Sequence, residues 1–255
     1  MGRLSECRYL PAFLIFTIMK AFYLFTFLLF PTYLMSQHQH MILQSEFLKK
    51  SIEIDMYRLG EEAKDMVFLT DGKKLLDHGA LPIFEKLTET GSIPPAYYVF
   101  VSTVDPETGE DHRNAYFFCN ENYLHFFEEE LISVVEEKIK QSFSPNNRSL
   151  IGISFGGLNA AYFSAHSTAF KSYGLLSPIT YPRKEVFQDI TFSTQTDLKI
   201  YLSTGKNDAE SYVKHLSATY QQKGYQLNVV EAEGGHDFQN WNSQWEEVLG
   251  FLLNS

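Results

Sequence analysis

Short, unbroken apolar runs alternate with stretches of helical periodicity from residue 66 to the end of the chain. Residues 66–69 and 97–101, for example, are aliphatic or aromatic at every position. Runs of this length are typical of strands buried on both faces, as in a parallel sheet. Because helical segments follow most of the runs, the pattern predicts an α/β protein with a mostly parallel sheet flanked by helices.

The pattern predicts eight strands in this sheet and five helices around it. The strands are residues 41–48, 51–57, 66–69, 97–101, 149–153, 173–176, 198–202 and 227–231. The helices are residues 75–89, 123–141, 156–165, 211–223 and 241–253, the first of them broken at Gly79 and Pro82. No helix separates the first two strands, so we expect them to form an antiparallel hairpin at one edge of the sheet.

Composition fits one such domain and excludes several classes of protein. The chain has 255 residues, of which 44% are hydrophobic and 20% charged, as is ordinary for a globular protein. Its formal net charge of -10 repels phosphate backbones, so we expect no nucleic-acid partner. The two cysteines, Cys7 and Cys119, are too few for a disulfide framework or a thiolate metal site. We expect Cys119 to be a partly buried structural residue.

The N-terminal region differs from the rest of the chain. Residues 21–34 are apolar and directly follow Lys20. A positive residue before an apolar stretch of this length is typical of a secretory signal peptide, with Ser36 the nearest small residue for cleavage. An uncleaved anchor helix is the alternative. We therefore expect residues 1–36 to be a signal peptide or anchor. Residues 37–255 are then an exported domain, secreted or periplasmic, with membrane contact only through an uncleaved N-terminal segment.

The motif G-x-S-x-G occupies residues 152–156, with Ser154 at its centre. It directly follows the expected strand 149–153 and opens a helix rich in small residues. A nucleophile on such a strand-to-helix turn needs small neighbours two positions away on either side, because the turn is tight. The free N–H groups of a helix N-terminus also favour a developing negative charge. Ser154 is therefore the candidate nucleophile.

A serine nucleophile needs a base, and three histidines follow Ser154 in the sequence. His166 lies near the end of the helix that Ser154 begins, too close in sequence to turn back. His215 lies within the expected helix 211–223 and has the pattern of a surface residue. His236 directly follows the expected strand 227–231, where this kind of site places its histidine. We therefore expect His236 to be the base.

The base in turn needs an acid that orients it. Asp208 follows the expected strand 198–202 and precedes His236, which leaves room for one helix and one strand between them. Glu210 lies in the same loop and remains the alternative. Asp197 precedes its strand and would lie at the opposite edge of the sheet, and Asp237 is adjacent to the histidine, where orientation is poor. Asp208 is therefore the expected acid.

An oxyanion hole should use two backbone N–H groups. One belongs to Phe155, directly after the nucleophile. The other should follow the third strand, residues 66–69, and so belongs to Gly72 or Lys73. An ordinary turn at this position is the alternative interpretation.

Taken together, the motifs resemble the branch of the α/β-hydrolases that includes enterochelin-type siderophore esterases and esterase D. The resemblance extends over residues 45–253. It rests on Phe68-Leu-Thr-Asp-Gly72, Gly91-Ser-Ile-Pro-Pro95, Arg113 before a long acidic helix, Gly152-Ile-Ser-Phe-Gly-Gly157, Leu176-Ser-Pro178 and Gly234-Gly-His-Asp-Phe-Gln-Asn-Trp241. It implies the α/β-hydrolase fold and hydrolysis of carboxylic esters by a Ser-His-Asp/Glu triad, without a metal or other cofactor. The segment after Arg113 lacks the Glu that often follows this arginine in the family, which removes support for a role in substrate positioning.

Other functions use the same residues. An acyltransferase needs the same triad and differs only in the acyl acceptor, and a peptidase of the prolyl-oligopeptidase type carries a similar serine motif. A surface binding protein on this scaffold would lack a member of the triad, and none is missing. The sequence leaves the ester open between small-molecule and carbohydrate-linked substrates, and it leaves the oligomeric state open.

Overall fold

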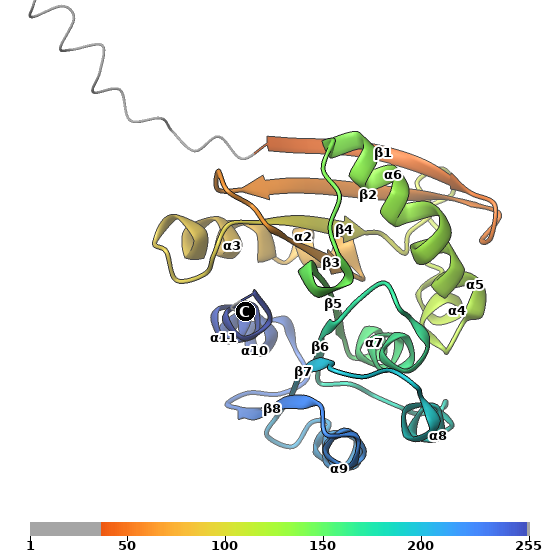
Figure 1. Ribbon diagram of the computed structural model, residues 1–255, viewed down its shortest axis with the longest axis vertical. Helices are drawn as coiled ribbons and strands as arrows, with labels where there is room; N and C mark the ends of the chain where they lie inside the picture. The colour runs from red at the N-terminus through yellow and green to blue at the C-terminus, as the bar shows by residue number, and fades with distance from the viewer. Residues whose placement is uncertain (1–36, 254–255) are drawn as a thin grey trace, which may run out of the picture. The chain divides into compact units, whose positions relative to one another are not determined.

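The computed structural model describes residues 37–253, which form an eight-stranded sheet in the order β1-β2-β4-β3-β5-β6-β7-β8 (Figure 1). The strands are β1 (Gln37–Ser45), β2 (Lys50–Leu59), β3 (Asp65–Leu69), β4 (Ala96–Val101), β5 (Arg148–Ile153), β6 (Ser172–Leu176), β7 (Lys199–Gly205) and β8 (Gln226–Ala232). The predicted number of strands is confirmed. So is the antiparallel hairpin, which β1 and β2 form at one edge.

Strands β3 to β8 pair in parallel, and β2 joins β4 in the antiparallel direction. The carboxyl ends of the parallel strands therefore meet along one edge of the sheet. The segments that follow β3, β5, β7 and β8 begin at this edge, and they carry the residues that the sequence analysis singles out. Open α/β sheets bind their ligands outside this edge.

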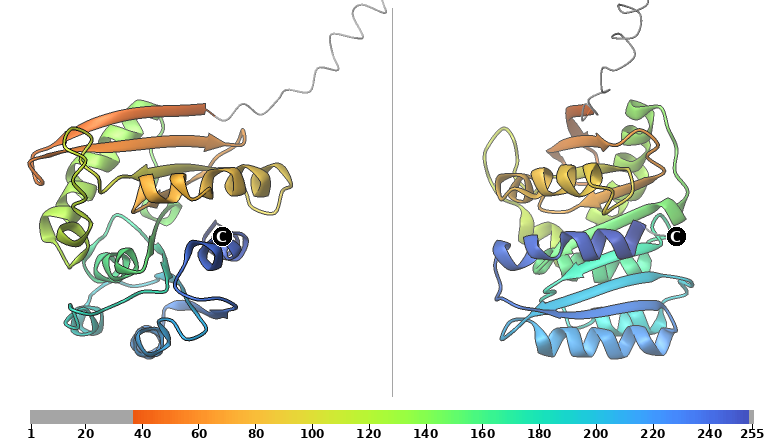
Figure 2. Two further views of the ribbon diagram at one scale, coloured as in Figure 1. Left: turned by 180° about the vertical axis from the view of Figure 1, so that it is seen from behind. Right: turned by 90° about the vertical axis from the view of Figure 1, so that its left-hand side faces the viewer.

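Helices cover both faces of the sheet (Figure 2), as predicted. They are α2 (Gly72–Asp77), α3 (Ala80–Glu89), α4 (Arg113–Phe117), α5 (Glu121–His125), the π-helix η2 (Phe126–Leu131), α6 (Ile132–Ile139), the 3-10 turn η3 (Pro145–Asn147), α7 (Phe155–His166), α8 (Val186–Phe192), α9 (Glu210–Lys223), α10 (Phe238–Ser243) and α11 (Trp245–Leu253). One core packs α4 to α9 on one face, and a second core packs α2, α3, α10 and α11 on the other. Successive side chains of a strand point to opposite faces, so Phe68 lies in the first core while Val67 and Leu69 lie in the second.

Three expected helices differ in their details. The break expected in residues 75–89 falls at Gly79, which has φ +82°, while Pro82 lies in the first turn of α3 and interrupts nothing. A proline is tolerated there because its missing N–H would have no acceptor within the helix. Residues 123–141 contain the π-helical segment η2, and Gln244 divides the last helix into α10 and α11. The sequence pattern does not predict α4 or α8, since each is too short to show periodicity.

The signal peptide or anchor predicted for residues 1–36 lies outside the described residues, so export stays a prediction. Among residues 37–253, no helix combines the length and the apolar character needed to cross a membrane.

Candidate active site

Ser154 occupies the tight turn between β5 and α7. Its backbone has φ 59° and ψ −117°, an uncommon conformation for a residue with a side chain. The turn requires small residues on both sides, because a Cβ on Gly152 would lie 2.0 Å from the carbonyl oxygen of Gly156. A Cβ on Gly156 would in turn lie 2.8 Å from Thr70 Oγ1. This is the geometry that the G-x-S-x-G motif predicts.

The backbone of the turn is tied to the neighbouring strand. The Ser154 N–H donates to the carbonyl of Leu176 at 2.9 Å, and the N–H of Ile179 donates to the carbonyl of Ser154 at 3.2 Å. These bonds hold the turn between the end of β6 and the loop after it. The serine side chain therefore has a fixed origin at the carboxyl edge of the sheet.

Ser154, His236 and Asp208 are brought together at this edge. His236 follows β8, and its Nε2 lies 2.8 Å from Ser154 Oγ. Its Nδ1 lies 2.5 Å from Oδ1 of Asp208, which follows β7. With the Nδ1 proton directed at the carboxylate, Nε2 is free to accept the hydroxyl proton. Ser154, His236 and Asp208 thus form a continuous chain of hydrogen bonds. This is the relative placement that a catalytic triad needs.

Asp208 and His236 are supported by their surroundings. The Asp208 side chain is 2% exposed, and its second oxygen accepts the N–H of Gly205 at 3.2 Å. The rings of Trp241 and His236 make an edge-to-face contact, with centroids 5.0 Å apart at 85°. The indole N–H of Trp241 donates to Ser177 Oγ at 3.0 Å, which fixes the ring. The imidazole is thus held by an anion on one side and an aromatic wall on another.

The rejected candidates lie elsewhere or have other partners. His166 lies 3.5 Å from Asp189, and His215 is exposed on α9. Glu210 is an exposed residue in the first turn of α9. Asp237 caps α10 by accepting the N–H of Asn240 at 2.9 Å. Among residues 37–253, only Asp208 pairs its carboxylate with His236.

The expected oxyanion donors occupy helix N-termini. Phe155 is the first residue of α7, and Gly72 and Lys73 are the first two residues of α2. The N–H groups of a first helical turn have no acceptor within the helix, so they are available to an anion. Gly72 permits a close approach of backbones, because a Cβ there would lie 2.5 Å from the carbonyl carbon of Phe100. The α2 turn also lies against the serine turn, since a Cβ on Gly156 would be 3.5 Å from Asp71 Oδ2.

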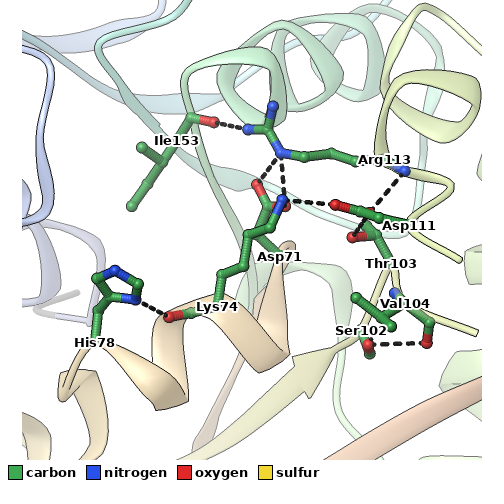
Figure 3. A network of polar contacts seen from close by, with 9 residues as sticks. All are labelled: Asp71, Lys74, His78, Ser102, Thr103, Val104, Asp111, Arg113 and Ile153. Atoms are coloured by element: carbon green, nitrogen blue, oxygen red, sulfur yellow. Dashed lines mark hydrogen bonds and ion pairs between the residues drawn. The ribbon is translucent and has the colours of Figure 1, made fainter. Parts of the chain in front are cut away.

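A buried ion pair joins these two turns (Figure 3). Arg113 Nε donates to both carboxylate oxygens of Asp71, at 2.7 and 2.8 Å, and its Nη2 donates to the carbonyl of Ile153 at 3.0 Å. Asp71 directly precedes Gly72, and Ile153 directly precedes Ser154. One guanidinium therefore connects the start of α2 with the end of β5. Burial raises the pKa of the Asp71 carboxyl, and the charge and hydrogen bonds of Arg113 oppose that shift.

The role of this pair is not evident from the sequence. Asp71 reads locally as a turn residue before Gly72, and Arg113 lies far along the chain. The signal available is that β3, a strand buried at four of its five positions, is followed by an aspartate two residues after its end. An acid buried there requires a cation, yet the sequence does not say which one.

Two further features do not belong to the Ser-His-Asp arrangement. A cavity of about 650 Å³ opens between α8 and α9, and its lining includes Tyr181, Phe187, Tyr212 and His215 but no member of the Ser-His-Asp arrangement. Cys119 is free and partly buried, as expected, and burial raises the pKa of its thiol to about 12. The thiol is therefore protonated at neutral pH and unsuited to act as a nucleophile.

The sheet order, the strand-to-helix serine turn and the late acid and histidine define an α/β-hydrolase fold. The chain belongs to the esterase family described as "Putative esterase", which matches residues 45–252. This membership confirms the resemblance seen in the motifs.

Individual relatives agree with this family. The iron(III) enterobactin esterase of Escherichia coli (strain K12) is 29% identical over 132 residues, which are 50% of this chain and 32% of that protein. The enterobactin esterase from Shigella flexneri, crystallised in the presence of enterobactin, is similar with a TM-score of 0.77 and 23% identity, over 87% of this chain and 60% of that one. The BES protein from Bacillus cereus is similar with a TM-score of 0.72 and 17% identity, over 89% of this chain and 99% of that one.

These likenesses differ in what they establish. The two solved structures are less than 25% identical to this chain, so they confirm the fold alone. The sequence match covers about a third of the curated relative, 32% of its length. The substrate of that relative is therefore a starting point for a proposal about this chain.

Proposed function

We propose that the protein is a serine esterase that cleaves carboxylic esters through an acyl-enzyme intermediate. The observation that carries the proposal is the 2.8 Å contact between His236 Nε2 and Ser154 Oγ. A serine hydroxyl is a weak nucleophile unless a base in direct contact takes its proton. The contact of Asp208 with the other ring nitrogen supports the same assignment.

Acylation begins with attack of Ser154 Oγ on the ester carbonyl carbon. His236 Nε2 takes the hydroxyl proton as the new C–O bond forms, and Asp208 stabilises the resulting imidazolium. The carbonyl oxygen gains negative charge and turns towards the N–H of Phe155. The N–H of Gly72 or Lys73, at the start of α2, supplies the second donor.

Collapse of the tetrahedral intermediate breaks the ester C–O bond. The imidazolium returns its proton to the leaving alkoxide, so a neutral alcohol departs and Ser154 retains the acyl group. Water then attacks the acyl-enzyme with His236 again as the base, which releases the carboxylic acid and restores the hydroxyl. An alcohol that replaced this water would make the same site an acyltransferase.

The substrate that we propose is a small-molecule ester. The relative with the sequence match is named for enterobactin, which makes enterobactin and its iron complex the first substrates to test. Feruloylated carbohydrate and short-chain acyl esters complete the panel.

The decisive experiment combines turnover with active-site labelling. Purified protein is assayed on a chromogenic short-chain ester and on the panel, and a serine-reactive phosphonate is applied in parallel. We expect turnover, and we expect a single label on Ser154 identified by peptide mass spectrometry. If the phosphonate labels Ser154 but no ester is hydrolysed, the assay is repeated with added alcohols and with peptides. Turnover only with these additions favours an acyltransferase or a peptidase. Neither labelling nor turnover favours a non-catalytic surface binding protein.

We also propose that residues 37–255 act outside the cytoplasm, because the N-terminal sequence has the pattern of a signal peptide or anchor. N-terminal sequencing of the native protein tests the cleavage, and cell fractionation tests the location. A native chain that begins at Met1 and fractionates with the cytosol would refute export.

A further inference from the structure

The outer face of the β1–β2 hairpin carries a cluster of potential metal ligands, far from the candidate active site. In the antiparallel register His40 lies opposite Asp55, and Ile42 lies opposite Glu53. His38 is two residues from His40, so it shares the same face of β1. Ile54, between Glu53 and Asp55 on β2, is buried in the first core. Glu53 and Asp55 therefore lie on the face of β2 turned away from that core.

The side chains of the cluster converge on one point. His40 Nδ1 lies 3.2 Å and His38 Nε2 lies 2.7 Å from the same Asp55 oxygen, Oδ1. One ligand atom each from His40, Glu53 and Asp55 lie within 4.8 Å of one another. Ligand atoms around a tetrahedral Zn²⁺ are about 3.4 Å apart, given bonds of about 2.1 Å. Small side-chain rotations are enough to reach that spacing.

Charge in the cluster is uncompensated. Among residues 37–253, the charged partners of Asp55 are His38 and His40, and Glu53 forms no ion pair. With neutral imidazoles the cluster carries two negative charges, those of Glu53 and Asp55. Carboxylates in this situation gain from a cation. Metal ligands are needed in that same protonation state, with neutral histidine and ionised carboxylate.

We propose that His40, Glu53 and Asp55 bind a divalent transition-metal ion, with Zn²⁺ the expected occupant. One imidazole with two carboxylates suits Zn²⁺ and its neighbours in the first transition row better than Mg²⁺ or Ca²⁺, which prefer oxygen ligands alone. His38 donates to Asp55 and orients that carboxylate, as hydrogen-bonded neighbours of metal ligands commonly do. Its ring is itself fixed by stacking on Tyr57, with centroids 4.4 Å apart at 9°.

The site would join β1 to β2 rather than take part in catalysis. Strand β1 is the edge of the sheet, and β2, β4 and β3 separate it from β5, which carries Ser154. At about 4.8 Å for each strand, the two sites are on the order of 20 Å apart. A metal that bridges His40 on β1 and Asp55 on β2 would fasten the edge strand, whose other side has no neighbouring strand.

The test measures Zn²⁺ binding to the purified protein, produced without a histidine tag. Isothermal titration calorimetry, with a chromogenic chelator as a competitor, should give one site per chain with a dissociation constant in the micromolar range or below. His40→Ala and Asp55→Asn should each weaken binding at least tenfold, and His38→Ala should weaken it less. His215→Ala removes an exposed histidine on α9 and serves as the matched control, which should bind like wild type.

Stability and activity supply independent readouts. Zn²⁺ should raise the Tm of wild type and of His215→Ala but not of His40→Ala, and circular dichroism verifies that each variant folds. Ester turnover by His40→Ala should equal that of wild type, so the metal proposal and the esterase proposal can fail separately. Absence of Zn²⁺ binding to wild type at millimolar concentration, or equal binding by wild type, His40→Ala and Asp55→Asn, overturns the proposal. Equal affinity for Mg²⁺ would also overturn it, since the carboxylates alone would then account for binding.

Discussion

Two buried carboxylates at the same edge of the sheet have different partners. Asp71 and Asp208 have similar side-chain exposures, 6% and 2%, and each is paired at short distance with a cationic or potentially cationic group. Arg113, the partner of Asp71, carries a guanidinium, which acts as a permanent cation in proteins. His236, the partner of Asp208, carries an imidazole, which can act as a proton acceptor. The role of a buried carboxylate is therefore set by its partner rather than by burial alone.

The surroundings of the two pairs follow the same division. The Arg113 guanidinium contacts the carbonyl of Ile153 and lies over the rings of Phe117 and Phe155, none of which takes up or releases a proton. The imidazole of His236 instead faces a hydroxyl that can react, and its side chain is 38% exposed. We infer that Asp71 and Arg113, the holding pair, keep the backbone in place, while Asp208 and His236, the proton-transfer pair, serve proton transfer. Variants of each pair can break or sharpen this distinction.

The largest effect is expected for Ser154 and for His236, the member of the proton-transfer pair that contacts it. Ser154→Ala removes the proposed nucleophile and His236→Ala removes its proposed base, and each should lower kcat by several powers of ten, with little further loss in the double variant. Ester hydrolysis under substrate saturation measures this, and urea unfolding shows that stability is retained. Full activity in His236→Ala would mean that a different base serves Ser154.

Asp208→Asn should have a smaller effect, on the order of a hundredfold or more in kcat. The amide keeps the shape of the side chain but no longer stabilises the imidazolium, and it favours the wrong tautomer of His236. Kinetics of Asp208→Asn beside Glu210→Gln make the comparison, with Glu210→Gln expected to match wild type. If the Glu210 variant were the more damaged of the two, the acid would be Glu210 and the rest of the mechanism would stand.

The holding pair should respond to shape rather than to charge. Arg113→Lys keeps the charge, but one ammonium cannot replace the fork that reaches both Asp71 and Ile153. We expect kcat to fall on the order of tenfold to a hundredfold with little change in KM, because the two turns that carry the oxyanion donors shift relative to each other. A kcat for Arg113→Lys equal to that of wild type would show that the ion pair has no influence on the site.

Loss of charge in the same pair should appear in stability. Arg113→Gln removes the hydrogen-bonded cation of the buried Asp71 and leaves Lys74 Nζ, 3.9 Å away, as its remaining cationic partner. The lost charged hydrogen bonds should lower the unfolding free energy by about 1.5–3 kcal/mol. Urea unfolding at neutral pH measures it, with the exposed Arg183 changed to glutamine as a matched control expected to stay near wild type. A loss as small as that of the control would mean that Lys74 compensates the charge of Asp71 without Arg113.

The two pairs also differ in how far the sequence predicts them. Ser154, Asp208 and His236 each follow a strand in a fixed chain order, so local pattern and order are enough to select them. Asp71 and Arg113 are 42 positions apart, in segments whose local patterns describe only a turn and a loop end. Neither segment has a local pattern that identifies the other as its partner, because their contact arises from the packing of α4 and α7 against the sheet. The tertiary fold, rather than local sequence, creates this ion pair.

The limits of the fold prediction have the same cause. The strands of the parallel sheet are buried on both faces, so their apolar runs are visible in the sequence. Strand β1 begins at Gln37, earlier than the apolar pattern indicates, because its first four residues are all polar and lie on an exposed edge strand. The π-helical segment η2 leaves the apolar periodicity intact, and a single residue, Gln244, ends α10. Such local changes depend on packing between elements.

The smallest expected effect concerns the pH dependence of stability. Burial raises the pKa of Asp71, so between its ordinary value near 4 and the raised value the folded state binds more protons than the unfolded state. Its contribution to stability therefore declines as pH rises through that window. Asp105 has the opposite sign, because its side chain accepts the N–H groups of Glu107 and Thr108, which lowers its pKa. Its contribution is lost as pH falls through the lowered value.

Urea unfolding between pH 3 and pH 7 separates these contributions. Relative to wild type, Asp71→Asn should make the unfolding free energy rise more steeply with pH above pH 4, because the proton taken up by the folded state is removed. Asp105→Asn should make it rise less steeply below pH 4. The sign of the change is the measured quantity, since both variants also lose hydrogen bonds that lower stability at every pH. An unchanged slope in Asp71→Asn would show that Arg113 cancels the effect of burial, and the holding pair would then stay ionised throughout the range.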